Sequence, residues 1–327
     1  MVENRESGSA PLMEVRDLSV TYRSRSESTR AVRGVSLCIH TGQTVSLVGE
    51  SGSGKSTVAL AMLGLLDPEN QTGQIRYMGN NLESLPEQEW RGIRSREIGI
   101  VFQDARSTLN PVMTILDHLI ETLRAHQGFS RTESRVRACE ILQEVGIPAG
   151  REKLYPFELS GGLCQRAGIA LGICNRPKLL IADEPTSAID SAIQAQILDL
   201  LQRMKERYGL ALLLISHDLP LVARVSDRIA VMYHGSVVES GLKEEVLAAP
   251  AHPYTRSLLQ CQPSFQNHHE RKPLAAIPGA VPKAGQEFPG CPFAPRCDRS
   301  EPRCRESVPA ARQISETCWV ACVREAE

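Results

Sequence analysis

Nine consecutive residues near the start of the chain have the composition of a phosphate-binding loop. Residues 49–57 read Gly-Glu-Ser-Gly-Ser-Gly-Lys-Ser-Thr, which fits the pattern G-x-x-x-x-G-K-[ST]. Glycines let backbone N–H groups turn toward phosphate oxygens, and the positive end of a following helix points at the same anion. A chance Gly-rich turn is the alternative, which the β-rich run before the loop and the helical run after it disfavour. The residues expected to contact a nucleotide here are Gly49, Glu50, Ser51, Gly52, Ser53, Gly54, Lys55, Ser56 and Thr57.

Two carboxylates farther along the chain complete a phosphoryl-transfer site. In such a site Lys55 reaches the β- and γ-phosphates of ATP, and the Ser56 hydroxyl binds Mg²⁺. Residues 179–184 read Leu-Leu-Ile-Ala-Asp-Glu, an apolar strand that ends in two acids. Asp183 is expected to hold the metal through water, and Glu184 to polarise the attacking water as a general base. An apolar strand ending in an acidic turn is common, so this motif gains its meaning from the loop upstream.

A second Gly-rich turn lies shortly before that strand. Residues 159–165 read Leu-Ser-Gly-Gly-Leu-Cys-Gln and precede a helical run. Ser160, Gly161 and Gly162 at a helix N-terminus form another anion site. The alternative is a plain serine cap on a helix. One chain gains little from two phosphate sites, so the second is not explained by this chain alone.

The elements that carry these motifs indicate an α/β fold. Residues 15–22 and 44–48 have strand character, and residues 55–66 read as a helix that follows the loop. The runs 179–182 and 211–215 are apolar on both faces, as in the buried centre of a parallel sheet. Helical patterns over 112–126 and 131–145 predict a helical subdomain at about 104–165. We expect a polar tail over 1–11, an ATPase domain over 12–250, a linker within 262–290 and a C-terminal extension over 251–327.

The order of these motifs resembles the ATP-binding cassette (ABC) family of ATPases. The resemblance implies a P-loop NTPase fold with a mostly parallel core, an N-terminal antiparallel part and an inserted helical subdomain. It implies that Tyr22 stacks on adenine, that Gln103 senses Mg²⁺ and the transporter contact, and that His217 contacts the γ-phosphate. Residues 187–190 are similar to the D-loop, which ends at Asp190. In the family two cassettes pair head to tail, so Ser160, Gly161 and Gly162 would act on the partner's nucleotide.

Segments after the cassette narrow the resemblance to the dipeptide, oligopeptide and nickel import branch. These are His-Pro-Tyr-Thr at 252–255 and the cysteine pattern that follows it. The branch implies an ATPase that energises uptake, working with a second ATPase chain, two membrane permeases and an extracytoplasmic binding protein. It also implies a peripheral position on the cytoplasmic face of the inner membrane. The transported substrate is not readable, because specificity lies in other chains.

Cysteines gather at the end of the chain. Of ten in all, six lie between Cys261 and Cys322, and Cys291, Cys297, Cys304 and Cys322 have the spacing C-x5-C-x6-C-x17-C. Clustered cysteines in a reducing compartment indicate a metal more than disulfides. Zinc sites favour closely paired cysteines, which are absent among these four, whereas four thiolates can hold an iron–sulfur cluster. The resemblance favours [4Fe–4S], with zinc or no metal as alternatives. Cys318 is an extra thiol.

Composition excludes some other functions. The formal net charge is −1, and no run of Lys or Arg forms a basic stripe, so nucleic acid is not an expected partner. The apolar runs are too short to cross a bilayer, and the polar N-terminus does not read as a secretory signal. Two rivals remain open: a soluble ABC ATPase unconnected with transport, and an iron–sulfur switch that uses nucleotide only as a signal. Because Glu184 and His217 are both present, the sequence predicts a site competent for hydrolysis.

Overall fold

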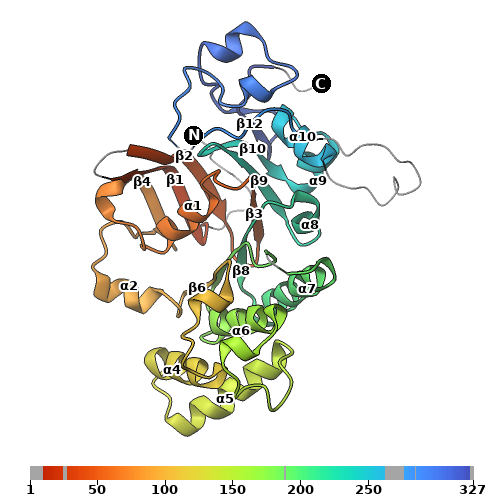
Figure 1. Ribbon diagram of the computed structural model, residues 1–327. Coiled ribbons are helices and arrows are strands. Elements are labelled where there is room, and N and C mark those ends of the chain that lie inside the picture. Colours follow the sequence, from red (N-terminus) through yellow and green to blue (C-terminus); the bar gives the residue numbers. More distant parts are fainter. Residues whose placement is uncertain (1–9, 25–27, 188, 262–275, 284, 325–327) are drawn as a thin grey trace, which may run out of the picture.

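The structure, a computed structural model, describes residues 10–24, 28–187, 189–261, 276–283 and 285–324 (Figure 1). Most of the predicted tail over 1–11 and part of the predicted linker over 262–290 lie outside these ranges, as does Ala188 of the D-loop. Within these ranges the strands form two sheets. Helices α4, α5 and α6 lie at one end of the molecule, and the C-terminal segment lies at the opposite end (Figure 1).

The larger sheet is parallel except for antiparallel strands along one edge. Its strand order is β11-β12-β10-β9-β3-β8-β7-β6, and β9, β3, β8, β7 and β6 run parallel to one another. The strands β3, β7 and β8 are buried along their whole length, as their apolar sequences predict. The strands are β3 (Thr44–Val48), β6 (Ile98–Val101), β7 (Leu179–Asp183), β8 (Ala211–Ser216), β9 (Arg228–Tyr233), β10 (Ser236–Leu242), β11 (Arg312–Gln313) and β12 (Trp319–Val320).

The smaller sheet is antiparallel and covers one face of the larger one. It consists of β1 (Met13–Arg23), β2 (Ser28–Ile39), β4 (Gln71–Tyr77) and β5 (Asn80–Asn81), in the order β2-β1-β4-β5. Alternate residues of the central strands enter two separate cores. On β7, Leu179 and Ile181 pack with the antiparallel sheet, whereas Leu180 and Ala182 pack with the helices on the other face. The parallel core and the N-terminal antiparallel part are as predicted.

Helices begin and end at recognisable local signals. The helix predicted over 112–126 is α4 and starts later, at Ile115, because the Thr114 side chain caps it by accepting from the Asp117 N–H. The helix predicted over 55–66 is α1 and ends early, at Met62. Gly64 just after it has a φ of +59°, and the Trp90 ring fills the place that a Cβ would take.

The helices are α1 (Lys55–Met62), α2 (Glu87–Ile93), α3 (Ala105–Thr108), α4 (Ile115–Gln127), α5 (Arg131–Glu144), α6 (Gly161–Ile173), α7 (Ser191–Tyr208), α8 (Leu219–Ala223), α9 (Lys243–Ala248) and α10 (Pro253–Gln260). Short 3₁₀ turns are η1 (Pro68–Asn70), η2 (Pro156–Glu158), η4 (Ala294–Arg296) and η5 (Pro302–Arg305). None of the helices in the described ranges is both long and apolar enough to cross a bilayer.

The end of the chain is joined to the main sheet, which the sequence pattern did not indicate. Strand β12 pairs with β10, so that Val320 lies opposite Glu239, and β11 pairs with β12. The segment between α10 and these strands contains the cysteine-rich turns η4 and η5. The cysteine-rich segment is therefore anchored at both ends to the body that carries the phosphate loop.

Candidate functional site

The phosphate loop joins β3 to α1 and is packed tightly at both ends. A Cβ on Gly49 would lie 2.1 Å from the Met232 carbonyl oxygen, and one on Gly54 would lie 2.4 Å from that of Ala31. Gly54 also has a φ of +99°, which side-chain-bearing residues rarely adopt. Sterics thus require glycine at both positions, and at Gly54 the backbone conformation requires it as well. The loop shape follows from the glycines, and the apolar strand before it fixes where the loop lies.

Lys55 at the start of α1 is buried and points back into the loop. Its Nζ donates to the carbonyl oxygens of Gly49 (2.8 Å) and Glu50 (2.9 Å), and lies 3.7 Å from Oε1 of Glu184. Burial lowers the pKa of the ammonium, while the carboxylates of Glu184 and Asp183 oppose that shift. A cation held over the loop in this way is placed to meet a phosphate.

Ser56 and Asp183 meet at the carboxyl end of the parallel strands. The Ser56 hydroxyl donates to Oδ1 of Asp183 at 3.1 Å. Burial raises the pKa of Asp183, and the hydrogen bond from Ser56 opposes the rise. Hydroxyl and carboxylate oxygens are ligands that Mg²⁺ accepts, and the ion takes its remaining ligands from water and phosphates. The two side chains therefore fit the predicted metal site, where bound Mg²⁺ would neutralise charge on the β- and γ-phosphates.

Glu184 contacts the two other predicted catalytic residues, Gln103 and His217. Its Oε2 lies 3.2 Å from Nδ1 of His217 and 3.2 Å from Nε2 of Gln103, which donates to it. The hydrogen bond with His217 is the main reason that the pKa of Glu184 is lowered and that of His217 is raised. Glu184 also has a φ of +43°, an uncommon conformation for a residue with a side chain. The Glu184 carboxylate is thus ionised at neutral pH and is held by two side chains.

Tyr22 and Asp190, the other predicted nucleotide contacts, lie at the edges of this group. Tyr22 on β1 is 40% exposed, and its hydroxyl donates to Oγ1 of Thr57 at 3.4 Å. Its ring is therefore accessible next to the end of the phosphate loop. Asp190 caps α7, where its side chain accepts from the Ile193 N–H. That contact explains Asp190 as a helix cap without reference to nucleotide.

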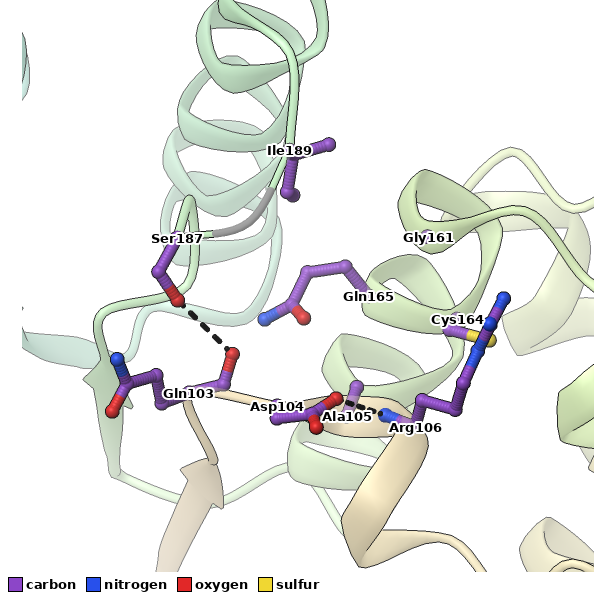
Figure 2. A pocket seen from close by; sticks show the side chains of 9 residues that line it. All are labelled: Gln103, Asp104, Ala105, Arg106, Gly161, Cys164, Gln165, Ser187 and Ile189. Atoms are coloured by element: carbon purple, nitrogen blue, oxygen red, sulfur yellow. Dashed lines mark hydrogen bonds between the residues drawn. The ribbon is translucent and has the colours of Figure 1, made fainter.

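The Gly-rich turn at 160–162 lies apart from the phosphate loop and lines a different cavity. Ser160 caps α6 by accepting from the Leu163 N–H, and Gly161 borders a cavity of about 340 Å³. Figure 2 shows Gly161 and Gln165 on one side of this cavity, with Gln103 and Ser187 on the other. The Ser187 hydroxyl donates to the Gln103 carbonyl oxygen at 3.2 Å. The turn thus borders a cavity shared with Gln103, and neither Lys55 nor Ser56 lines that cavity.

The four predicted cluster cysteines converge on one small cavity. Cys291, Cys297, Cys304 and Cys322 all line a space of about 20 Å³. Burial raises the pKa of Cys297 to about 11 and raises that of Cys291, so both are protonated thiols at neutral pH. Within the described ranges, no three Cys, His, Asp or Glu side chains are placed to hold one metal ion. The donor set fits a four-thiolate group, but the space has room for about one water molecule.

Cys318, the extra thiol, lies elsewhere. It is buried against Gly241 on β10, where a glycine Cβ would approach its Sγ to 2.9 Å. Burial raises its pKa to about 12. It does not line the cavity of the other four cysteines. Cys318 is therefore a packing residue and not a spare ligand of that group.

Two residues contact the phosphate loop although the sequence did not predict these contacts. Arg296, between Cys291 and Cys297, pairs with both carboxylate oxygens of Glu50 (2.7 and 2.9 Å). The hydroxyl of Tyr254 accepts from the Glu50 N–H at 2.9 Å. Both residues stand more than 200 positions from Glu50. Tyr254 lies in a segment that carries the family resemblance, but no pattern in the sequence joins either residue to the loop.

The fold, the phosphate loop and the two carboxylates at the strand ends define a P-loop ATPase. Comparison with known families gives the particular kind: residues 32–187 match the ABC transporter family, and residues 238–304 match the C-terminal region of oligopeptide and dipeptide transporters. With the relative described next, these matches show that the chain belongs to the ABC transporter family, as one of its ATP-binding subunits.

A relative of similar length supports this assignment over nearly the whole chain. The dipeptide transport ATP-binding protein DppD of Escherichia coli (strain K12) is 42% identical over 309 residues, covering 93% of this chain and 94% of that protein. Among solved structures, a dimeric ATP-binding cassette bound to ADP and phosphate superposes with a TM-score of 0.65 at 30% identity, covering 71% of this chain and 98% of the other. The protein cbiO1 of Clostridium perfringens, part of an ABC transporter complex, gives a TM-score of 0.62 at 27% identity, covering 73% and 91%.

Proposed function

We propose that the chain binds Mg²⁺–ATP on the phosphate loop and hydrolyses it to drive uptake of dipeptides, oligopeptides or a related substrate. One observation carries the catalytic part. Glu184 accepts hydrogen bonds from Gln103 and His217 while it lies 3.7 Å from Lys55. A carboxylate in this position activates water, Lys55 binds phosphate, and Ser56 with Asp183 holds the metal.

The proposed cargo and partners rest on the relatives. DppD is named for dipeptide transport, and the C-terminal match is to transporters of oligopeptides and dipeptides. We infer that the chain works with two membrane permeases, a second ATPase chain and an extracytoplasmic binding protein, at the cytoplasmic face of the inner membrane. The proposed units are the ATPase domain over 12–250, with its helical subdomain at about 104–165, and the extension over 251–327.

A partner cassette is proposed to close the site. Ser160 and Gly161 are exposed, and the cavity of about 340 Å³ that Gly161 lines includes no residue of the phosphate loop. Ser160→Arg is therefore expected to leave Mg²⁺–ADP binding by the purified chain within about twofold of wild type. In the assembled transporter it lowers ATPase turnover about 10²-fold, because donors to the partner's phosphates are lost. Calorimetry and phosphate release measure the two effects.

The matched control is Ser130→Arg, which replaces another exposed serine cap, at the start of α5. It loses the cap but lies in no predicted nucleotide contact, so the transporter keeps wild-type turnover. Weakened nucleotide binding by the Ser160→Arg chain alone would instead place the turn at its own phosphate loop.

We further propose that Cys291, Cys297, Cys304 and Cys322 hold a [4Fe–4S] cluster with a structural role. The four thiols line one cavity, and Arg299 and Arg324 line it too, which favours an anionic thiolate group. A single tetrahedral zinc ion would draw the sulfurs to about 3.8 Å from one another, by Zn–S bonds of about 2.3 Å. Because the cavity is small, the four side chains must turn or separate to admit a cluster. Binding also releases the thiol protons, so it weakens in acid.

Cysteine substitution tests the cluster. After anaerobic purification, wild type is expected to contain iron and acid-labile sulfide in equal amounts, and Cys297→Ala to lose most of both. Cys318→Ala is the control, because that thiol is also shielded from solvent, more fully than Cys297, but lies outside the cavity. Iron-free, folded wild-type protein from such a preparation would refute the cluster, and zinc in its place would support the alternative.

A further inference from the structure

The cysteine-rich segment reaches the nucleotide loop through one arginine. Arg296 ends the turn η4 and stands next to Cys297 in the chain. Its side chain is 5% exposed and its two terminal nitrogens pair with both oxygens of the Glu50 carboxylate. Bidentate pairs of this kind fix orientation as well as distance. Glu50 is the second residue of the phosphate loop, so the pair joins the extension directly to the site.

Arg296 is itself held in a fixed position. Its Nε donates to the Pro278 carbonyl oxygen at 3.0 Å, and Nη1 also donates to the Tyr233 hydroxyl at 3.3 Å. The guanidinium lies 5.9 Å from the Tyr233 ring centre and 6.0 Å from that of Phe293. These contacts leave the side chain little freedom, so that its position determines that of Glu50.

A cluster of three buried aromatic side chains contacts the same loop. Tyr233, Tyr254 and Phe293 are fully buried, with ring centres 4.6 to 5.3 Å apart. The Tyr254 hydroxyl accepts from the Glu50 N–H, and Tyr233 directly follows Met232, whose carbonyl oxygen packs on Gly49. The side chain and the N–H of Glu50 are thus both engaged from the side of the extension. This leaves the other loop residues to face a nucleotide.

We propose that Arg296 and Tyr254 are positioning residues that hold the phosphate loop in its binding conformation through Glu50. The proposal rests on the proposed placement of ATP on this loop. Phosphate recognition by backbone N–H groups requires the loop to be preorganised, because each donor must point at a fixed anion. If the contacts of Glu50 are removed, the nucleotide has to order the loop when it binds. Part of the binding free energy is then spent on that ordering.

Nucleotide binding by variants of the full chain tests this. Arg296→Ala is expected to weaken Mg²⁺–ADP binding about tenfold, as positioning losses do, and Glu50→Ala to do the same. Arg296→Lys keeps the charge but loses the fork, so it weakens binding about threefold. Isothermal titration calorimetry measures the dissociation constant, and a thermal melt without nucleotide is recorded for each variant.

The double variant separates positioning from folding. Each single substitution leaves a charge unpaired, the buried Arg296 or the half-buried Glu50, and lowers the melting temperature. Glu50→Ala with Arg296→Ala removes both charges and restores much of it. Nucleotide binding stays about tenfold weak in the double variant if the pair positions the loop. Recovery of binding together with the melting temperature would overturn the proposal. If Arg296→Ala does not fold, wild-type binding by Arg296→Lys would overturn it as well.

Two control variants test whether the effect on binding is specific to the contact between Arg296 and Glu50. Glu287→Ala breaks another bidentate pair between the extension and the ATPase body, with Arg33 on β2, and is expected to bind Mg²⁺–ADP as wild type does. Equal weakening by Glu287→Ala would show that loosening the extension anywhere suffices, and would overturn the specific role of Arg296. Lys55→Ala tests the nucleotide site itself. If this variant binds Mg²⁺–ADP normally, the proposed nucleotide site is wrong. If Lys55→Ala weakens binding but the variants of Arg296 and Glu50 do not, the nucleotide site stands and only the positioning role fails.

Discussion

Glu184→Gln is expected to bind Mg²⁺–ATP as wild type does and to lower ATPase turnover about 10²- to 10⁴-fold, the range for loss of a general base. The amide has the shape of the carboxylate, so the contacts with Gln103 and His217 are kept within small shifts. What is lost is the ability to accept a proton from water. Phosphate release by the assembled transporter and nucleotide titration of the purified chain measure the two quantities.

The control for this prediction is Glu121→Gln, which makes the same chemical change at an exposed position on α4. It is expected to leave turnover unchanged. Hydrolysis at the wild-type rate by Glu184→Gln would remove Glu184 from the role of base. The same outcome would favour the rival in which another group activates the water.

Lys55→Ala is expected to weaken nucleotide binding at least tenfold and to lower turnover about 10²- to 10³-fold, since a charged donor to the phosphates is lost. The side chain is 3% exposed and lies 3.7 Å from Glu184, so its removal also leaves that carboxylate without its nearest lysine. The pKa of Glu184 should then rise, because Lys55 is one of the groups that lower it. Calorimetry with Mg²⁺–ADP measures binding.

Lys153→Ala serves as the matched substitution, because Lys153 is an exposed lysine just before the turn η2. It is expected to bind nucleotide normally. If Lys55→Ala kept wild-type affinity and turnover, the loop at 49–57 would not be the nucleotide site, and the meaning of Asp183 and Glu184 would be in doubt with it.

Local sequence patterns predicted most of the helices and strands, and with them the positions of most candidate site residues. The apolar runs at β3, β7 and β8 predict buried parallel strands, and parallel strands bring their carboxyl ends to one edge. That places the loop after β3 at the same edge of the sheet as Asp183 and Glu184, and the strand order, with β8 between β3 and β7, comes from the structure. Element ends were less predictable: α1 stops at Met62, where Gly64 takes the left-handed conformation that ends many helices and Trp90 packs against it.

The cysteine spacing indicated a common binding group, and the four side chains do line one cavity. The same spacing could not separate Cys318 from its neighbours in the chain. Its exclusion follows from β12, which pairs with β10 and draws Cys318 onto Gly241. A pairing between strands so far apart in the chain has no local sequence signal, because either strand could pair elsewhere.

The phosphate loop shows what the sequence determined and what only the tertiary structure determined. Its glycines, Lys55 and Ser56 are specified by the sequence alone, because backbone shape and phosphate chemistry require those residue types at those positions. The sequence was silent on what holds Glu50. That depends on Arg296, 246 residues away, and on a buried aromatic cluster formed from separate elements. Only the tertiary structure brings these together, since ion pairs and ring contacts at such separation follow from the packing of the whole chain.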